Sequence, residues 1–183
     1  LRDQLCERGR RFTTTSDTEV VLKAYAEWGE EAFAKFNGMF ALGIWDHQER
    51  ELILARDKFG KKPLYVAIKD QRLSFASELR ALMKDPSLSC RVSVSNAALT
   101  HYFALGYILS PKTIYNEVEK LEPASLLRFR EGRVVERRRY WDFAESFLIR
   151  NTKPEAEVLA DLDGLFDAAV KRRLVSDVPV GAF

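Results

Sequence analysis

The chain has 183 residues, 46% apolar and 31% charged, so it can bury a core and is not typical of a disordered protein. Its 29 basic and 27 acidic residues are interspersed and leave a net charge of +2, which excludes a general attraction to nucleic acid or membrane surfaces. The two cysteines are too few for a disulfide framework, and no apolar run reaches the roughly 20 residues that cross a bilayer. We expect a soluble chain from a reducing, cytoplasmic setting.

The first predicted element is a helix over residues 16–36. It opens with Ser16-Asp-Thr-Glu19, the S-x-x-E pattern of a capping box, in which the serine and glutamate side chains bind free amides at a helix start. Apolar residues then recur every three or four positions as far as Phe36, with Gly29 interrupting the pattern. The apolar stripe predicts that one face of this helix belongs to a core.

Four strands are predicted after the helix. The linkers between them are short and polar or contain Gly and Pro, which favours an antiparallel meander. Several of the runs are apolar on both faces, so we expect the sheet to be covered on both sides, by the preceding helix and by another layer such as a second sheet. The four predicted strands are 39–45, 52–55, 64–68 and 73–76.

Two short helices and a hairpin follow. The helices are predicted over 77–84, ahead of an Asp-Pro pair, and over 95–105, ended by Gly106. The hairpin joins 126–130 to 133–140 through a Glu-Gly turn.

The last part of the chain has a different pattern. Residues 144–153 show no periodicity and predict a linker, so we place a domain boundary near residue 150, between domains 1–150 and 151–183. Thr152-Lys-Pro-Glu155 is a second capping-box pattern, followed by the clearest apolar stripe in the chain and then by a predicted strand that begins at Val178.

Both ends of the sequence fall inside predicted elements. Leu1 opens a polar helical stretch and is not an initiator Met, and the C-terminus is the apolar run 178–183. A strand that stopped there would leave its backbone groups unpaired. The sequence therefore predicts that both ends are cut from a longer chain.

Most familiar catalytic patterns are missing. There is no Gly-rich phosphate loop with Lys-Ser/Thr, no H-E-x-x-H and no C-x-x-C. The only histidines, His47 and His101, fall in a predicted turn and on a predicted helix, which gives no basis for a Ser-His-Asp arrangement. The arginines between residues 128 and 139 are interleaved with glutamates and are explained by the solvated face of a hairpin. No metal site is predicted.

Asp17 has two interpretations from the pattern alone. A carboxylate in the first turn of a helix suits the positive end of the helix dipole, which is a structural role. The same carboxylate could hold the ammonium group of an amino-acid substrate. The pattern alone favours the structural role.

A series of motifs resembles the asparagine synthetase family, whose N-terminal half is a class II glutamine amidotransferase. The segments stand in the order of the family and together cover essentially the whole chain. They are SDTEV at 16–20, FNGMFA at 36–41 with WD at 45–46, RDKFGKKPLY at 56–65, FASEL at 75–79, LEPAS at 121–125, YW at 140–141 and DVPVG at 177–181. One departure is Val66, where the family usually has a second tyrosine.

The resemblance implies an α+β fold: a partial N-terminal-nucleophile (αββα) glutaminase sandwich, followed by the first helix and strand of an α/β ATP-pyrophosphatase domain. In the family an N-terminal cysteine attacks the glutamine amide, and the ammonia released passes to an aspartate activated by ATP and Mg²⁺. Leu1 is not that cysteine, and neither Cys6 nor Cys90 can contribute a terminal amine. We therefore expect no catalytic residue and no bound cofactor in this fragment, and no glutamine hydrolysis by it.

The resemblance also assigns binding roles. Asp17 matches the aspartate that holds the α-amino group of glutamine, and Phe183 follows the strand leading to the nucleotide loop, so it is expected beside the nucleotide. Further signature residues are interpreted as setting loops and supporting sheets, with Gly60 supplying an unusual backbone angle and Pro63 a stiff strand start. The other signature residues are Arg56, Asp57, Lys62, Ser77 and Glu78.

The predicted function is therefore that of a fragment of a glutamine-dependent asparagine synthetase. The implied partners are glutamine, aspartate and ATP, with a homodimer in the parent protein and no nucleic acid or membrane. Two alternatives stay open: a non-catalytic regulatory or binding module that kept the amidotransferase fold, and a related class II amidotransferase with another acceptor.

Overall fold

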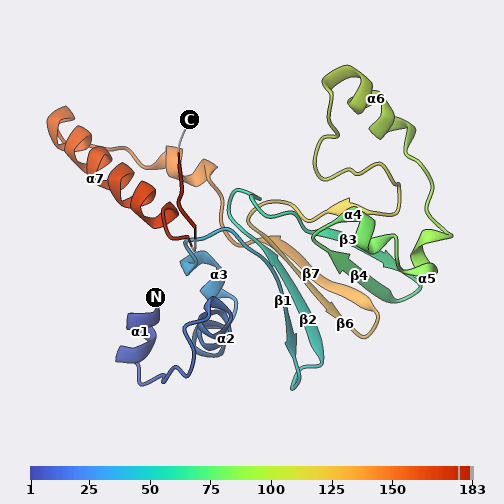
Figure 1. Cartoon of the computed structure of the whole chain (residues 1–183), viewed down its shortest axis with the longest axis horizontal. Coiled ribbons are helices and arrows are strands. Elements are labelled where there is room, and N and C mark those ends of the chain that lie inside the picture. The colour runs from blue at the N-terminus through green and yellow to red at the C-terminus, as the bar shows by residue number, and fades with distance from the viewer. Residues whose placement is uncertain (177, 182–183) are drawn as a thin grey trace. The chain divides into compact units, whose positions relative to one another are not determined.

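The computed structural model describes residues 1–176 and 178–181. The chain divides into two compact units, Leu1–Asp142 and Phe143–Phe183 (Figure 1). The strands belong to the first unit, and the second unit is helical in its described part. No helix of the described residues is both long and apolar enough to cross a membrane.

Three helices form the start of the first unit. Gly29 adopts φ 57° and ends α2, so the stripe predicted as one helix is carried by α2 and α3. The predicted interruption at Gly29 is therefore confirmed. Its physical reason is that glycine readily adopts a positive φ, which ends an α-helix. The helices are α1 (Arg2–Glu7), α2 (Asp17–Trp28) and α3 (Glu31–Lys35).

The strands form two antiparallel sheets. A four-stranded sheet has the order β1-β2-β6-β7, and a three-stranded sheet has the order β4-β3-β5. The predicted strands and the last hairpin are confirmed. The bounds are β1 (Ala41–Asp46), β2 (Glu51–Arg56), β3 (Tyr65–Lys69), β4 (Arg72–Ala76), β5 (Glu119–Lys120), β6 (Ser125–Arg130) and β7 (Arg133–Arg139).

The prediction of one continuous meander is wrong between β2 and β3, which lie in different sheets. The physical reason is the loop after β2. The buried Asp57 carboxylate binds backbone amides of this loop, including those of Lys61 at 2.9 Å and Lys62 at 2.9 Å, and so turns the chain away from β2. Long-range contacts of this kind are not visible in a periodic pattern.

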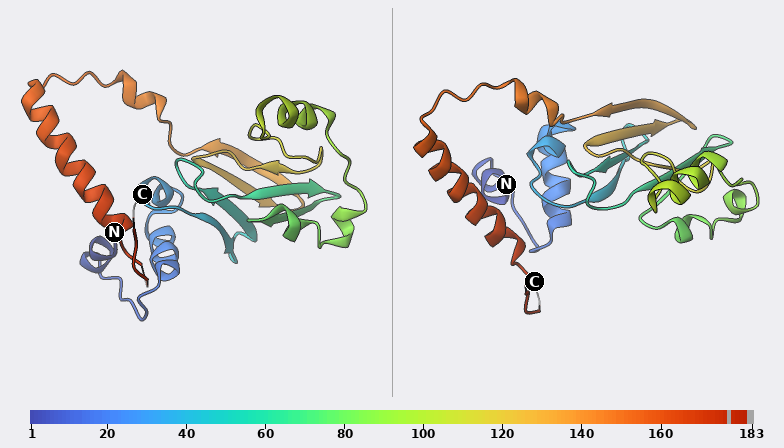
Figure 2. Two further views of the ribbon diagram at one scale, coloured as in Figure 1. Left: turned by 45° about the horizontal axis from the view of Figure 1, so that its top comes forward. Right: turned by 90° about the horizontal axis from the view of Figure 1, so that it is seen from above.

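The two sheets face each other (Figure 2). A Cβ atom on Gly43 of β1 would lie 3.3 Å from the ring of Phe75 on β4, so these strands are in close contact across the sandwich. An ion pair of 2.7 Å between Arg137 of β7 and Glu119 of β5 also links the two sheets. The core between the sheets is apolar. The buried residues of this core are Leu54, Leu64, Val66, Leu121 and Leu127.

Helices cover the outer faces. Phe33 of α3 packs in one cluster with Ile53 of β2 and Leu126 of β6, which places the first helices on the four-stranded sheet. The short helices α4 (Leu79–Leu82) and α5 (Pro86–Ser89) bury Leu82 and Leu88 against Ala67 of β3. The layers are therefore αββα, as the resemblance implied.

The helix α6 (Asn96–Leu105) extends away from the strands in Figure 1. Ser95 caps it by accepting a hydrogen bond from the amide of Ala98 at 3.3 Å, and Gly106 ends it at φ 78°. Both ends were predicted, because caps and left-handed glycines are local features.

The second unit consists of a short 3-10 helix, Ala144–Leu148, and the long helix α7 (Glu155–Arg173). The predicted capping box is wrong here. The N-cap is Pro154, without a side-chain hydrogen bond, and the amide of Lys153 binds Asn151 at 3.0 Å instead. No residue of α7 is buried.

The predicted strand from Val178 is not present in residues 178–181, because the described part of this unit offers no neighbouring strand for backbone hydrogen bonds. Phe183 lies outside the described residues. The predicted boundary near residue 150 falls within the second unit, and the assignment of this unit to an ATP-binding domain stays a prediction.

Candidate functional site

Asp17, the first residue of α2, lines a pocket of about 560 Å³. The wall opposite the helix is formed by the segment that leads into β1 and by β1 itself. Two further segments complete it, one from the loop before β3 and one ahead of α4. The lining residues are Asp17, Thr18, Val21 and Leu22, the run 39–44, Lys62 and Pro63, and Ser77 and Glu78.

Three charged side chains of this pocket are exposed, those of Asp17, Lys62 and Glu78. None of the three side chains has a hydrogen bond or ion pair with another group in residues 1–176 or 178–181. The ammonium group of Lys62 offsets one of the two carboxylates, so the side chains leave one net negative charge. A pocket of this charge suits a small molecule with an ammonium group.

Asp57 shapes the loop that carries Lys62 into the pocket. Its side chain is 1% exposed. The carboxylate accepts hydrogen bonds from the amides of Phe59 at 3.1 Å, Lys61 at 2.9 Å and Lys62 at 2.9 Å, and a longer one from Phe40 at 3.3 Å. Phe40 belongs to the wall formed by residues 39–44. One buried carboxylate therefore fixes two walls of the pocket.

Arg56 supports the same loop from the other side. Its guanidinium donates to the carbonyl oxygens of Gly60 and Lys62, both at 2.8 Å, and of Leu121 at 2.5 Å. Burial lowers the pKa of Arg56 from its ordinary value, and the negative charge of Asp57 opposes that change. The three carbonyl contacts satisfy a buried cation and tie the loop to the second sheet.

Gly60 is required at its position for two reasons. Its φ is 62°, as predicted for an unusual backbone angle. A Cβ atom there would also lie 2.9 Å from Pro123 and 3.0 Å from the Arg56 guanidinium. Any other residue would disturb the loop that holds Lys62.

Tyr140 is a supporting residue to which the sequence analysis gave no role. Its hydroxyl donates to the carbonyl oxygen of Arg56 at 2.7 Å, and burial raises the pKa of this phenol. The Tyr-Trp motif at 140–141 marked the position, but only the fold shows what the hydroxyl contacts.

The other candidate residues from the sequence do not line this pocket. Cys6 lies on α1, and the thiol of Cys90 donates to the carbonyl oxygen of Pro86 at 2.7 Å. His47 lies between β1 and β2 and His101 on α6. Within the described residues, no group of three or more His, Cys, Asp or Glu side chains could hold a metal ion.

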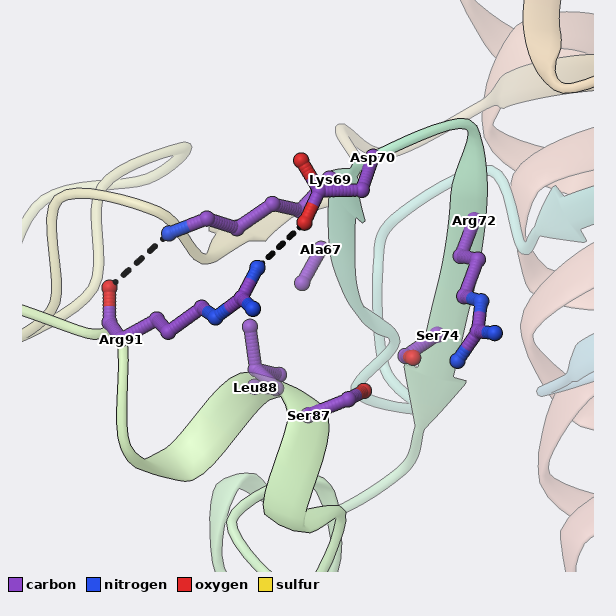
Figure 3. A pocket seen from close by; sticks show the side chains of 8 residues that line it. All are labelled: Ala67, Lys69, Asp70, Arg72, Ser74, Ser87, Leu88 and Arg91. Atoms are coloured by element: carbon purple, nitrogen blue, oxygen red, sulfur yellow. Dashed lines mark hydrogen bonds and ion pairs between the residues drawn. The ribbon is translucent and has the colours of Figure 1, made fainter.

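A second pocket, of about 290 Å³, has more basic side chains than the pocket at Asp17, but most of them already bind neighbouring groups (Figure 3). The ammonium group of Lys69 donates to the carbonyl oxygen of Arg91 at 3.1 Å, and Arg91 is paired with Asp70. The Ser87 hydroxyl at its wall donates to the carboxylate of Asp85 at 2.7 Å. Because Lys69 and Arg91 already have partners, this pocket is a weaker candidate than the one at Asp17.

Comparison with known proteins points to one family. A family model described as a glutamine amidotransferase domain matches residues 1–141. The chain is 36% identical over 185 residues to asparagine synthetase [glutamine-hydrolyzing] 3 of Bacillus subtilis, covering 100% of this chain and 29% of that protein. It is 37% identical over 171 residues to the putative asparagine synthetase [glutamine-hydrolyzing] 2 of Methanocaldococcus jannaschii, covering 93% and 33%. The chain thus spans about a third or less of the length of these relatives.

Among solved structures, the glutamine phosphoribosylpyrophosphate amidotransferase from B. subtilis, complexed with ADP and GMP, is similar with a TM-score of 0.51 and 20% identity. The match covers 76% of this chain and 26% of that one. At this identity the likeness concerns the fold alone, and it confirms the predicted fold class of a partial N-terminal-nucleophile glutaminase.

Proposed function

The chain belongs to the glutamine amidotransferase domain family, and from this premise we propose that Asp17 binds the α-amino group of glutamine. The observation that carries the proposal is the placement of this carboxylate. It is exposed, has no partner among the described residues, and lines a pocket large enough for an amino acid. A carboxylate that only interacts with the helix dipole does not require a pocket beside it, so the dipole does not explain this placement.

We further propose that the chain is part of a glutamine-dependent asparagine synthetase. The names and identities of the two relatives support this. In such a protein glutamine would supply ammonia to an aspartate activated by ATP and Mg²⁺. Phe183 would lie beside the nucleotide, and the protein would form a homodimer. Two free cysteines, Cys6 and Cys90, suit the reducing cytoplasm.

The polypeptide of residues 1–183 is expected to release no ammonia from glutamine. Hydrolysis of this kind needs a thiol next to the amide and donors for the oxyanion. Neither Cys6 nor Cys90 lines the Asp17 pocket. An ammonia assay on the purified chain, with a buffer blank, tests this, and release above the blank would contradict it.

The glutamine-binding role is tested by Asp17→Asn in the full-length synthetase that we propose. Loss of the charge should raise KM for glutamine by roughly ten-fold or more, because a charge-assisted hydrogen bond to the substrate is lost. Synthesis from free ammonia should stay unchanged. Equal loss of both activities would show that Asp17 is structural.

Asp3→Asn is the matched control. Asp3 is also an exposed aspartate in the first turn of a helix, α1, but it does not line the pocket. If the helix dipole were the whole explanation for Asp17, the two variants should behave alike. We expect Asp3→Asn to leave KM for glutamine unchanged.

A further inference from the structure

The side chain of Glu19 does not act as the capping-box pattern predicts. It lies on α2 two residues after Asp17, and its carboxylate extends back to the loop before the helix. Its oxygens accept hydrogen bonds from the amide of Thr13 at 3.0 Å, from the amide of Thr14 at 2.8 Å and from the hydroxyl of Thr14 at 2.8 Å. The carboxylate therefore anchors the loop instead of closing the helix end.

Two cations strengthen this anchor. Lys23, one turn after Glu19 on the same helix, forms an ion pair with its carboxylate at 3.1 Å and also donates to the carbonyl oxygen of Arg11. Arg2 of α1 donates to the carbonyl oxygens of Thr14 at 2.8 Å and Ser16 at 3.2 Å. The loop is thus held from α1 and from α2 at once.

The anchor is connected to Asp17 through Thr14 and Ser16. The hydroxyl of Thr14 donates to Glu19 and accepts a hydrogen bond from the amide of Ser16 at 3.2 Å. Ser16 in turn caps α2 by accepting from the amide of Thr18 at 3.2 Å. The backbone that carries Asp17 is therefore fixed by residues that do not themselves line the pocket.

We propose that Glu19 is a positioning residue for Asp17: by anchoring residues 13–16 it sets where the Asp17 carboxylate meets the ammonium group of glutamine. The inference rests on the proposed function of Asp17. Glu19 is not among the residues that line the pocket, so it acts through the backbone and not by touching the substrate.

The charge of Glu19 is matched to this role. The hydrogen bond from the Thr13 amide, with those from Thr14, lowers the pKa of the Glu19 carboxyl well below its ordinary value. The anchor is therefore ionised at any pH at which the protein would work, and its hydrogen bonds to the loop are charge-assisted.

The experiment compares variants in the full-length protein, with glutamine and with free ammonia as nitrogen source. Glu19→Gln keeps the size of the side chain but removes its charge and turns one acceptor into a donor. We expect KM for glutamine to rise by roughly ten-fold, with kcat for the ammonia-dependent reaction unchanged. An equal loss with both nitrogen sources, or no change in KM, would overturn the inference.

Glu27→Gln serves as the control. Glu27 lies on the same helix and forms two ion pairs, with Arg8 at 3.3 Å and Arg10 at 2.8 Å, but it has no hydrogen bond or ion pair with residues 13–16. Removing its charge should not alter KM for glutamine. A rise as large as that of Glu19→Gln would mean that any charge lost from α2 has this effect, which would also overturn the inference.

Two further variants keep the test decisive. If Glu19→Gln fails to fold, Thr14→Val removes the hydroxyl that donates to Glu19 and accepts from the Ser16 amide, while the Thr14 amide still donates to Glu19. An unchanged KM for glutamine in that variant counts against the inference. Asp17→Asn separates the two proposals. If Asp17→Asn raises KM and Glu19→Gln does not, only the positioning role fails. If Asp17→Asn has no effect, the proposed glutamine site itself fails.

Discussion

The helices α2 and α7 start at the same kind of sequence pattern, but they differ in capping and in burial. Ser16 and Glu19 flank the start of α2, and Thr152 and Glu155 form the same pattern before α7. Only α2 receives a side-chain cap, and only α2 packs its apolar stripe into a core cluster, through Ala24. A local pattern thus predicts that a helix exists, while its cap and its burial depend on the residues that the fold brings to it.

The largest expected difference between the first unit and the second is in the rate of amide hydrogen exchange. The amides of β2, inside the sandwich, should exchange at least on the order of a thousand-fold more slowly than those of α7. The reason is that α7 has no buried residue, and Leu162, Leu165 and Phe166 on its stripe are 59%, 65% and 69% exposed. Most of the stability of a helix in a protein comes from packing of its apolar face, which α7 lacks.

Exchange measured by mass spectrometry on the purified monomer, with fragments covering 51–56 and 155–173, tests this. Equally slow exchange in both fragments would show that α7 is packed in solution. In that case the assignment of α7 to a separate domain would be wrong.

A pair of phenylalanine variants should differ by several kcal/mol. Phe33 is fully buried and packs against the rings of Tyr25, Phe36 and Tyr140, with centroids 5.9 to 6.2 Å away. Phe33→Ala should lower the free energy of unfolding of the first unit by about 3–5 kcal/mol. Phe166→Ala on α7 should change it by less than about 0.5 kcal/mol. Urea titrations followed by tryptophan fluorescence measure both, and similar midpoints for the two variants would contradict the packing described.

Ion pairs give a somewhat smaller contrast. Arg128 pairs with Glu51 at 2.8 Å, and the Glu51 side chain is only 3% exposed, whereas the pair of Lys171 and Asp167 on α7 is open to solvent. Arg128→Ala leaves a buried carboxylate without its cation and should cost about 3 kcal/mol. Lys171→Ala should cost less than about 0.5 kcal/mol.

The same urea titrations at low and high salt separate the two cases. The effect of Arg128→Ala should persist in high salt, because burial protects the pair from screening. A salt-sensitive loss of the size seen for Lys171→Ala would mean that the Arg128 pair behaves as a surface pair.

Much of the fold could be predicted because its signals are local. Gly29 and Gly106 end helices through their own backbone angles, and the strand runs are visible as changes of period. The strand pattern did not predict that the chain changes sheets between β2 and β3, because this change depends on Arg56 reaching the carbonyl oxygen of Leu121 and on the amides bound by Asp57. These partners become neighbours only in the folded chain.

The candidate site shows the same limit. The position of Asp17 at a helix start follows from the sequence, and the resemblance suggested its ligand. The wall formed by residues 39–44 and the contacts of Glu19 with Thr13 and Thr14 could not be predicted, since the S-x-x-E pattern fits a capping box equally well. The signal for Glu19 was present, but it pointed to the wrong partner.

The smallest effect concerns the two caps themselves. The Ser16 hydroxyl accepts a hydrogen bond from the Thr18 amide at 3.2 Å, whereas α7 starts at Pro154 without a side-chain cap. Ser16→Ala should lower the free energy of unfolding of the first unit by about 1 kcal/mol, the usual cost of losing an N-cap. Thr152→Ala should change neither that free energy nor the helical circular dichroism of the chain, because Thr152 satisfies no amide of α7. Since the replacement is alike at both sites and both follow an S/T-x-x-E pattern, the difference between them isolates the contribution of the cap. A loss of helicity in Thr152→Ala would show that the capping box forms in solution, and the contrast between α2 and α7 would then be one of packing alone.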